Sequence, residues 1–298
     1  MKHKKIICFI KNKNDLNIEK IKRKFKYVEL IKINKNNIKD NIKNDNIYFI
    51  SKNIDKELKK QLIIELLSND KLFYIELDFI DMLKIKNKIV LFKDIPTIKI
   101  NKLKLKVGKR FIKRVFDIFF SILAIIIFIP FFIIVPILIK IDSKGPIIYK
   151  QKRLTMNNKE FTIYKFRSMI KDAELKSGPV FAYKSDPRIT KIGRILRKYK
   201  IDELPQFFNV LIGDMSIVGP RPERKYFMDL LENEIPEYKL RLKFKAGITC
   251  YAHVFGNYHT SFKKRIEYDI LYMNNWNIFK DFELIILTIK KVILGSEK

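Results

Sequence analysis

An apolar stretch at residues 118–139 limits the folds open to this chain. These 22 residues carry no charged side chain. As one helix they would extend about 33 Å, close to the thickness of the hydrocarbon core of a bilayer. A helix buried in a globular core is the alternative, but such a helix seldom runs this long without a charge. The stretch therefore predicts contact with a membrane.

The residues around this stretch argue against a single crossing. A single crossing keeps its cationic end in the cytoplasm, whereas here lysine and arginine flank both ends. Pro130 removes one backbone donor and crowds the preceding turn, so the helix should break there, and Pro136 predicts a second interruption. We expect a re-entrant anchor over residues 115–139 with both flanks cytoplasmic. The flanking cations are Lys109, Arg110, Lys113, Arg114, Lys140, Lys144, Lys150, Lys152 and Arg153.

The first 105 residues differ in composition from the rest. All 9 glycines and 9 of the 10 prolines lie beyond residue 100. Short apolar runs predict strands at residues 6–10, 27–33, 47–50, 72–77 and 89–92, and a helical pattern covers residues 56–67. We expect a small α/β domain over residues 1–105. Without glycine it has no glycine-rich phosphate loop, which argues against a dinucleotide site.

The net charge of +30 implies an anionic partner. Nucleic acid, phosphate-bearing substrates and an anionic membrane face all fit that charge. The two cysteines exclude a disulfide scaffold and a zinc finger, and the three histidines argue against a histidine-rich metal site. The chain also lacks the zinc spacing and the aromatic motif of common nucleic-acid-binding folds.

Adjacent carboxylates at Asp202 and Glu203 form the first candidate site. Asp202 fits the N-cap of a helix, where the helix dipole and nearby cations would keep it ionised and able to act as a nucleophile. Glu203 offers a hard oxygen ligand for Mg²⁺. An ordinary capped helix explains the same residues. The nearby cations are Arg197, Lys198 and Lys200.

Two further segments suit phosphate recognition. Lys165 and Arg167 flank an aromatic residue at the end of a predicted strand. Pro220 and Pro222 stiffen the backbone around Arg221, whose planar guanidinium suits bidentate contact with phosphate. A solvated strand end and a rigid surface turn are the alternatives for these two segments.

In this order, behind an apolar segment, these motifs resemble the bacterial sugar transferases. These are monotopic phosphoglycosyl transferases that act as undecaprenyl-phosphate sugar-1-phosphate transferases. The resemblance covers residues 109–298 and implies a mainly helical α+β monotopic membrane domain. Residues 1–105 resemble the CoA-binding-like module of longer members. The matching segments are residues 113–117, 143–146, 151–153, 165–169, 172–174, 186–190, 192–197, 202–206, 209–211 and 213–223.

The resemblance implies a reaction and roles for particular residues. Asp202 would attack the β-phosphorus of a UDP-sugar, release UMP and pass the phospho-sugar to undecaprenyl phosphate, as the first membrane step of polysaccharide or glycoconjugate synthesis. Asp202 and Glu203 would hold Mg²⁺. Substrate contacts are implied for Lys165, Arg167, Arg188, Arg197, Pro220, Arg221, Pro222 and Asp269.

The same resemblance implies a location and partners. It implies the bacterial inner membrane, with the active site facing the cytoplasm, and no nucleic-acid partner. It is compatible with a homodimer. Nothing in the residues names the sugar, the pathway or the ligand of the N-terminal module.

The chain departs from the family in two segments. The family has Pro-Gly-Ile-Thr-Gly where this chain has Ala246 to Cys250, and residues 256–260 also differ, which bears on sugar identity. We expect Cys250 to be a packing thiol, and His253 and His259 to be hydrogen-bonded loop or core residues. An inactive scaffold for polysaccharide assembly, a basic nucleic-acid-binding protein and a glycosyltransferase without a covalent step remain as alternatives.

Overall fold

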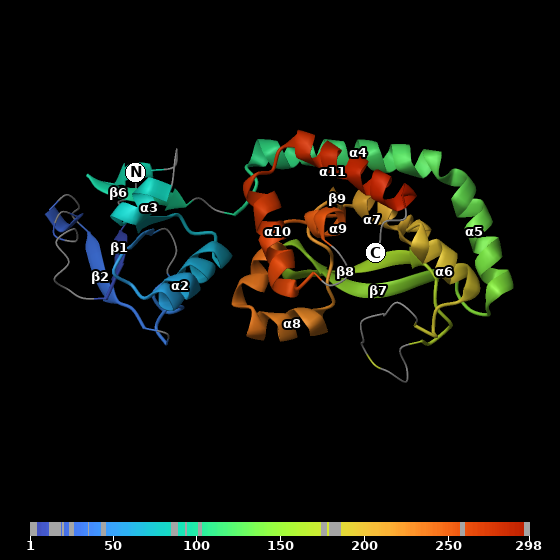
Figure 1. Cartoon of the computed structure of the whole chain (residues 1–298), viewed down its shortest axis with the longest axis horizontal. Helices are drawn as coiled ribbons and strands as arrows, with labels where there is room; N and C mark the ends of the chain where they lie inside the picture. Colours follow the sequence, from blue (N-terminus) through green and yellow to red (C-terminus); the bar gives the residue numbers. More distant parts are fainter. Residues whose placement is uncertain are drawn as a thin grey trace. The chain divides into compact units, whose positions relative to one another are not determined.

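The computed structural model describes residues 5–11, 19, 21–23, 27–34, 36–42, 46–84, 89–92, 94–100, 103–173, 178, 186–256 and 260–294. The chain divides into two compact units, Met1–Lys104 and Leu105–Lys298 (Figure 1). The first unit is built on a sheet and the second is mainly helical, which confirms this part of the predicted fold class.

One sheet runs through the first unit, with strand order β2-β1-β3-β4-β6-β5. Strands β2, β1, β3 and β4 are parallel, whereas β6 is antiparallel to both of its neighbours. The predicted strands are confirmed as β1 to β5. The elements are β1 (Ile6–Ile10), β2 (Val28–Lys32), β3 (Ile47–Ile50), α2 (Lys56–Ser68), β4 (Phe73–Glu76), α3 (Phe79–Lys84), β5 (Ile89–Phe92) and β6 (Ile95–Ile100).

Strand β1 shows why this sheet needs cover on both faces. All five of its residues are buried and apolar. Because side chains alternate along a strand, Ile7 and Phe9 pack with Leu62 and Leu66 of α2, while Ile6 and its alternates pack on the other face. A continuous apolar strand of this kind is typical of parallel sheets covered on both sides.

The second unit begins with two long helices and continues into short strands and helices. Its elements are α4 (Val107–Ile127), α5 (Ile129–Asp142), β7 (Ile148–Thr155), η1 (Met156–Asn158), β8 (Lys159–Phe166), α6 (Lys191–Lys198), η2 (Ile201–Glu203), α7 (Gln206–Ile212), β9 (Ser216–Val218), α8 (Lys225–Glu234), η3 (Pro236–Lys243), β10 (Gly247–Thr249), α9 (Tyr251–Phe255), α10 (Phe262–Asn274) and α11 (Ile278–Ile293).

The apolar stretch forms a bent pair of helices. Helices α4 and α5 meet at Phe128 with a bend of 60°. Pro130 lies at the start of α5, where its missing N–H costs no helical hydrogen bond. The predicted break is therefore present, but the predicted interruption at Pro136 is wrong, because α5 continues through it. Among the described residues no single helix is long and apolar enough to cross a bilayer, although this pair passes when taken together.

Beyond its first turn, helix α4 buries three polar residues. Lys113, Asp117 and Ser121 are buried against the rest of the unit. The opposite side of α4 exposes large apolar side chains, the reverse of a helix on the surface of a soluble protein. The exposed residues are Phe111, Ile112, Val115, Phe119, Ile122, Leu123, Ile126 and Ile127.

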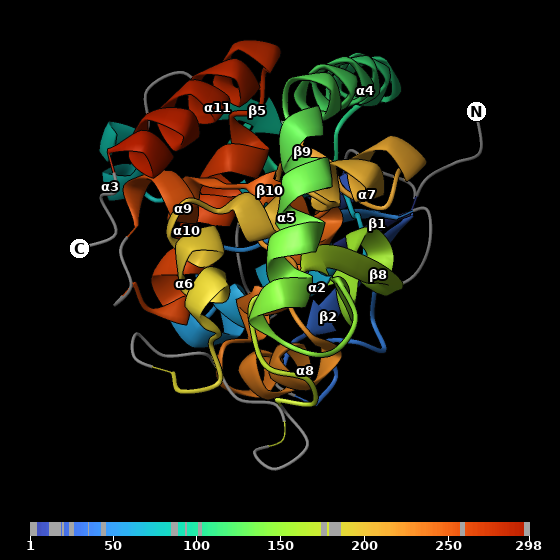
Figure 2. The same ribbon diagram turned by 90° about the vertical axis from the view of Figure 1, so that its right-hand side faces the viewer.

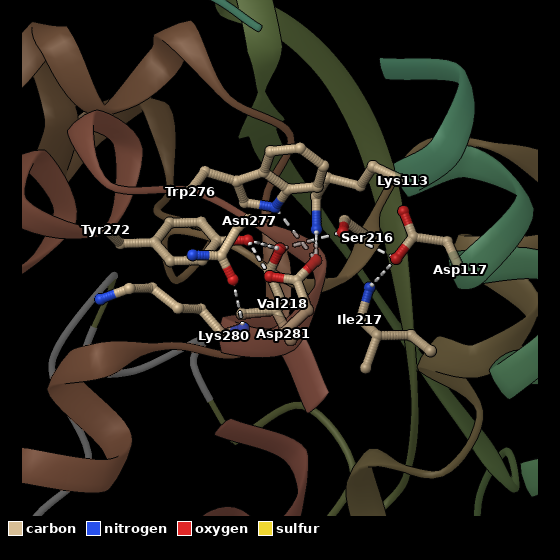
Figure 3. A network of polar contacts seen from close by, with 10 residues as sticks. All are labelled: Lys113, Asp117, Ser216, Ile217, Val218, Tyr272, Trp276, Asn277, Lys280 and Asp281. Carbon is tan, nitrogen blue, oxygen red and sulfur yellow. Dashed lines mark hydrogen bonds and ion pairs between the residues drawn. The ribbon is translucent and has the colours of Figure 1, made fainter. Parts of the chain in front are cut away.

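A buried polar network fixes this orientation of α4 (Figure 3). Lys113 Nζ lies 2.7 Å from a carboxylate oxygen of Asp281, which also accepts hydrogen bonds from Tyr272 and Trp276. Asp117 accepts from the hydroxyl of Ser216 and from the next backbone N–H. The network thus joins α4 to α10, α11 and β9.

Candidate active site

Asp202 and Glu203 lie in the short 3-10 turn η2, between α6 and α7. Lys200 adopts φ +56, which ends α6 and reverses the chain into this turn. Both carboxylates are buried, with 7% and 8% of their surface exposed. The prediction that Asp202 caps an α-helix is wrong, because α7 begins only at Gln206, directly after Pro205.

Two cations from other segments meet Glu203. Lys165 Nζ lies 2.6 Å from Glu203 Oε1, and a guanidinium nitrogen of Arg221 lies 3.7 Å from the same oxygen. Burial alone would raise the pKa of Glu203, but Lys165 and Arg221 hold it well below its usual value. Glu203 is therefore ionised at neutral pH.

Asp202 has a different environment from its neighbour. Its Oδ1 is buried and accepts no hydrogen bond from the described residues. Burial, and then the negative charge of Glu203, raise the pKa of Asp202 to about 6. Lys165, Lys200 and Arg197 act in the opposite direction, but burial outweighs them. Asp202 is still mostly ionised at pH 7, and among the described residues its buried Oδ1 has no hydrogen-bond donor.

Strand β8 brings Lys165 to this turn. Lys165 is the penultimate residue of β8. The buried side chain of Asn209 on α7 accepts from the backbone N–H of Tyr164 and donates to the carbonyl of Thr162. These two bonds, at 3.0 and 2.7 Å, attach β8 to the helix that follows Glu203. The spacing between Lys165 and Glu203 is therefore set by a side chain outside both motifs.

The turn that carries Arg221 is held by a close approach of two backbones. A Cβ added at Gly219 would lie 2.2 Å from the carbonyl oxygen of Lys245, so only glycine fits there. Pro220 and Pro222 are buried, and the carbonyl of Pro220 accepts from the N–H of Gly247. The side chain of Arg221 remains 40% exposed and points toward Glu203.

Other predicted site residues make structural contacts elsewhere. A guanidinium nitrogen of Arg167 donates to the carbonyl of Ser143 at 2.6 Å, at the end of α5. Arg188 pairs with Asp186 at 2.6 Å, and Asp269 pairs with a buried arginine at 3.0 Å. The partners in these contacts are residues other than Asp202 and Glu203. Arg197, in the last turn of α6, does lie near Asp202 and acts to lower its pKa.

His253 is a site residue that sequence reasoning did not select. It lies in α9, and its Nε2 meets a guanidinium nitrogen of Arg221. Its one distinguishing feature in the sequence was its position between the two segments that depart from the family pattern, residues 246–250 and 256–260. Cys250 is buried and free, as a packing thiol would be. His259 lies outside the described residues.

The two carboxylates are the candidates for holding a metal ion. Within the part of the chain that the structure describes, no three His, Cys, Asp or Glu side chains are grouped to bind one. Mg²⁺ often takes only one or two carboxylates and completes its shell with water and substrate phosphates. Asp202, whose Oδ1 has no donor among the described residues, lies beside ionised Glu203 and fits that pattern.

The chain is similar in sequence to proteins of a known family. Residues 108–295 match the bacterial sugar transferase family. The chain belongs to this family. It is 42% identical over 188 residues to a UDP-N-acetylgalactosamine-undecaprenyl-phosphate N-acetylgalactosaminephosphotransferase of Aeromonas hydrophila, covering 62% of this chain and 44% of the relative. It is 41% identical over 189 residues to a UDP-glucose:undecaprenyl-phosphate glucose-1-phosphate transferase of Klebsiella pneumoniae, covering 62% and 40%.

A shorter relative is matched over nearly all of its length. The exopolysaccharide production protein PSS of Rhizobium leguminosarum is 42% identical over 187 residues, covering 60% of this chain and 93% of that protein. The chain spans less than half the length of the two relatives named first. All three similarities confirm the family, and the CoA-binding-like nature of the first unit stays a prediction.

Proposed function

We propose that this sugar transferase moves a sugar 1-phosphate from a UDP-sugar to undecaprenyl phosphate through a covalent intermediate on Asp202. The observation that carries the proposal is the meeting of Asp202 and Glu203 with Lys165 and Arg221. The names of the relatives support both substrates. Phosphoryl transfer needs positioning and charge neutralisation more than acid–base groups, and this cluster offers both.

The reaction divides into two displacements at one phosphorus. A carboxylate oxygen of Asp202 attacks the β-phosphorus, and the bond from that phosphorus to the bridging oxygen breaks, so that UMP leaves with the electron pair. A phosphate oxygen of undecaprenyl phosphate then attacks the same phosphorus, and the bond to Asp202 breaks. The carboxylate is regenerated, so the two steps balance without a proton shuttle.

The charged neighbours have separate tasks in this scheme. Arg221, stiffened by its two prolines and partly exposed, would bind phosphate oxygens of the donor. Lys165 keeps Glu203 ionised and adds positive charge near the reacting phosphorus. Asp202 and Glu203 would hold Mg²⁺, which would neutralise charge on the diphosphate when bound.

Membrane attachment is supported by the reversed polarity of α4. A helix that buries lysine and aspartate while exposing phenylalanine and isoleucine suits a surrounding lipid phase. Helix α11 lies beside α4 (Figures 1 and 2), where the rings of Phe120 and Phe282 are 6.2 Å apart. It exposes a second apolar row at helical spacing: Phe279, Phe282, Ile286, Ile289 and Ile293.

We infer that α4 and α5 enter the cytoplasmic leaflet of the bacterial inner membrane and return to the same side. The cations at both ends support this topology. It would keep the two carboxylates on the side where UDP-sugars are made and near the lipid phosphate. Cysteines introduced at Leu105 and Lys144 should be labelled from the same side by an impermeant thiol reagent, and labelling from opposite sides would refute the topology.

The reaction is tested by UMP release from membranes supplied with Mg²⁺, undecaprenyl phosphate and a panel of UDP-sugars. Asp202→Asn should abolish release while the protein stays membrane-bound, and EDTA should silence the wild type. Asp229→Asn is the matched control, because Asp229 is an exposed residue of α8 that pairs with Lys225. Full release by Asp202→Asn would refute the covalent step and favour a glycosyltransferase without one. No release by the wild type would favour a scaffold.

A further inference from the structure

The guanidinium of Arg221 is held between two residues from different segments. One terminal nitrogen lies 3.7 Å from Glu203 Oε1, beyond ordinary hydrogen-bond range. The other lies 2.5 Å from Nε2 of His253. Because the side chain is 40% exposed, packing alone does not fix it. The contact with His253 is therefore the tighter restraint on its direction.

The contact with Arg221 determines the protonation state and tautomer of His253. Arginine stays protonated and can only donate. Nε2 of His253 must therefore accept, which leaves its proton on Nδ1 and the imidazole neutral. Burial, and then the charge of Arg221, lower the pKa of His253 well below its usual value, in agreement with a neutral ring.

Helix α9, which carries His253, is itself fastened to α11. The ammonium of Lys291 donates to the carbonyls of His253 at 2.7 Å and Gly256 at 2.9 Å. A cation at this position also satisfies the negative end of the short helix. Strand β10, which directly precedes α9, is also bonded to α11, because the hydroxyl oxygens of Thr249 and Thr288 lie 2.6 Å apart.

We propose that His253 is a positioning residue that directs Arg221 toward the diphosphate of the sugar donor, and that Lys291 holds His253 in place. This inference rests on the proposed function, in which Arg221 binds the donor. A long, partly exposed arginine loses side-chain entropy when it binds phosphate. A fixed acceptor on one nitrogen lowers that cost and leaves the remaining donors for the substrate.

A double-mutant cycle tests the positioning role. Wild type, His253→Ala, Arg221→Ala and the double variant are compared by UMP release in the full-length membrane-bound protein. His253→Ala should raise KM for the UDP-sugar about tenfold with little change in kcat, the size expected for one lost hydrogen bond to a charged group. The double variant should be no worse than Arg221→Ala. Additive effects would refute the proposal.

Two substitutions separate positioning from packing. His253→Gln keeps a side-chain acceptor and should restore most of the lost KM, whereas equal losses with Gln and Ala would contradict the role. Lys291→Met should raise KM in the same direction. Its matched control is Lys290→Met, because Lys290 lies next to it on α11 but is exposed. Equal KM values for the two lysine variants would refute the part assigned to Lys291.

The experiment distinguishes failure of the positioning role from failure of the proposed reaction. Absence of UMP release by the wild type refutes the reaction, whereas normal release with additive variants refutes only the positioning. The melting temperatures of the same four proteins need no turnover and should also be non-additive. If they are additive, the contact between Arg221 and His253 does not stabilise the protein and the proposal fails on that ground.

Discussion

Replacing Lys113 with methionine should strongly destabilise the second unit. Lys113 pairs at 2.7 Å with Asp281, and their side chains are 8% and 0% exposed. Methionine keeps the length of the side chain but leaves Asp281 as a buried carboxylate without its cation. Removing one partner of a buried pair costs about 3–5 kcal/mol.

This cost converts into a shift in melting temperature. In a domain of roughly 150–250 residues, 1 kcal/mol corresponds to roughly 2–4 °C. The expected decrease is therefore roughly 6–20 °C. Trp276 is the only tryptophan of the chain and donates to the same carboxylate at 3.1 Å, so its fluorescence reports on this network directly.

The control and a second variant make the test decisive. Lys225→Met removes an exposed pair with Asp229, both side chains being 58% exposed, and should cost no more than about 1 kcal/mol. Adding Asp281→Asn to Lys113→Met removes the uncompensated charge, so the double variant should lose less than the sum of the two single variants. Equal shifts for Lys113→Met and Lys225→Met would refute the reasoning, as would strict additivity.

Three further predictions follow from burial, backbone approach and surface chemistry. Gly219→Ala should abolish UMP release and lower the melting temperature, because its Cβ would lie 2.2 Å from a backbone oxygen; normal activity would show that the turn adapts. Phe119→Glu combined with Ile126→Glu should move the protein from the membrane pellet to the supernatant, since both side chains are exposed on α4; an unchanged pellet fraction would contradict lipid contact. Burial raises the pKa of Cys250 to about 11, so its reactive thiolate is scarce at pH 8, and iodoacetamide should modify it only after denaturation. Rapid modification of the native protein would contradict that burial.

Much of the first unit was predictable because its signals are local. The apolar runs at Ile6–Ile10, Ile47–Ile50 and Ile89–Phe92 coincide with β1, β3 and β5. Strand β6 was missed, because proline usually marks an edge or the end of a strand and Pro96 lies within β6. Here β6 pairs with β4 on one side and with β5 on the other.

The limits of the anchor depended on tertiary contacts. The sequence placed it at residues 115–139, because the charged residues before 115 suggested a solvated flank. The helix instead begins at Val107. Lys113 is buried within it because it pairs with Asp281, which lies 168 residues later in the chain. No local pattern reveals such a partner.

The sequence predicted which residues form the core of the candidate site, but it did not predict their burial or their contacts. Asp202, Glu203, Lys165 and Arg221 were named from the sequence, and the structure brings them together. The raised pKa of Asp202 depends on burial created by distant segments. Likewise, the sequence could not show that Arg167 binds the carbonyl at the end of α5. Many lysine and arginine residues of this chain stand in similar local sequence, so the sequence does not show which of them contact substrate and which bind the protein itself.

The covalent step is tested most directly by stopping the reaction after its first half. The purified protein is incubated with Mg²⁺ and a UDP-sugar without undecaprenyl phosphate, and the products are followed by UMP release and peptide mass spectrometry. The proposal predicts about one UMP per active site and a sugar-phosphate adduct on the peptide that contains Asp202. Full turnover on later addition of lipid phosphate, with no UMP burst and no adduct on Asp202 beforehand, would contradict it.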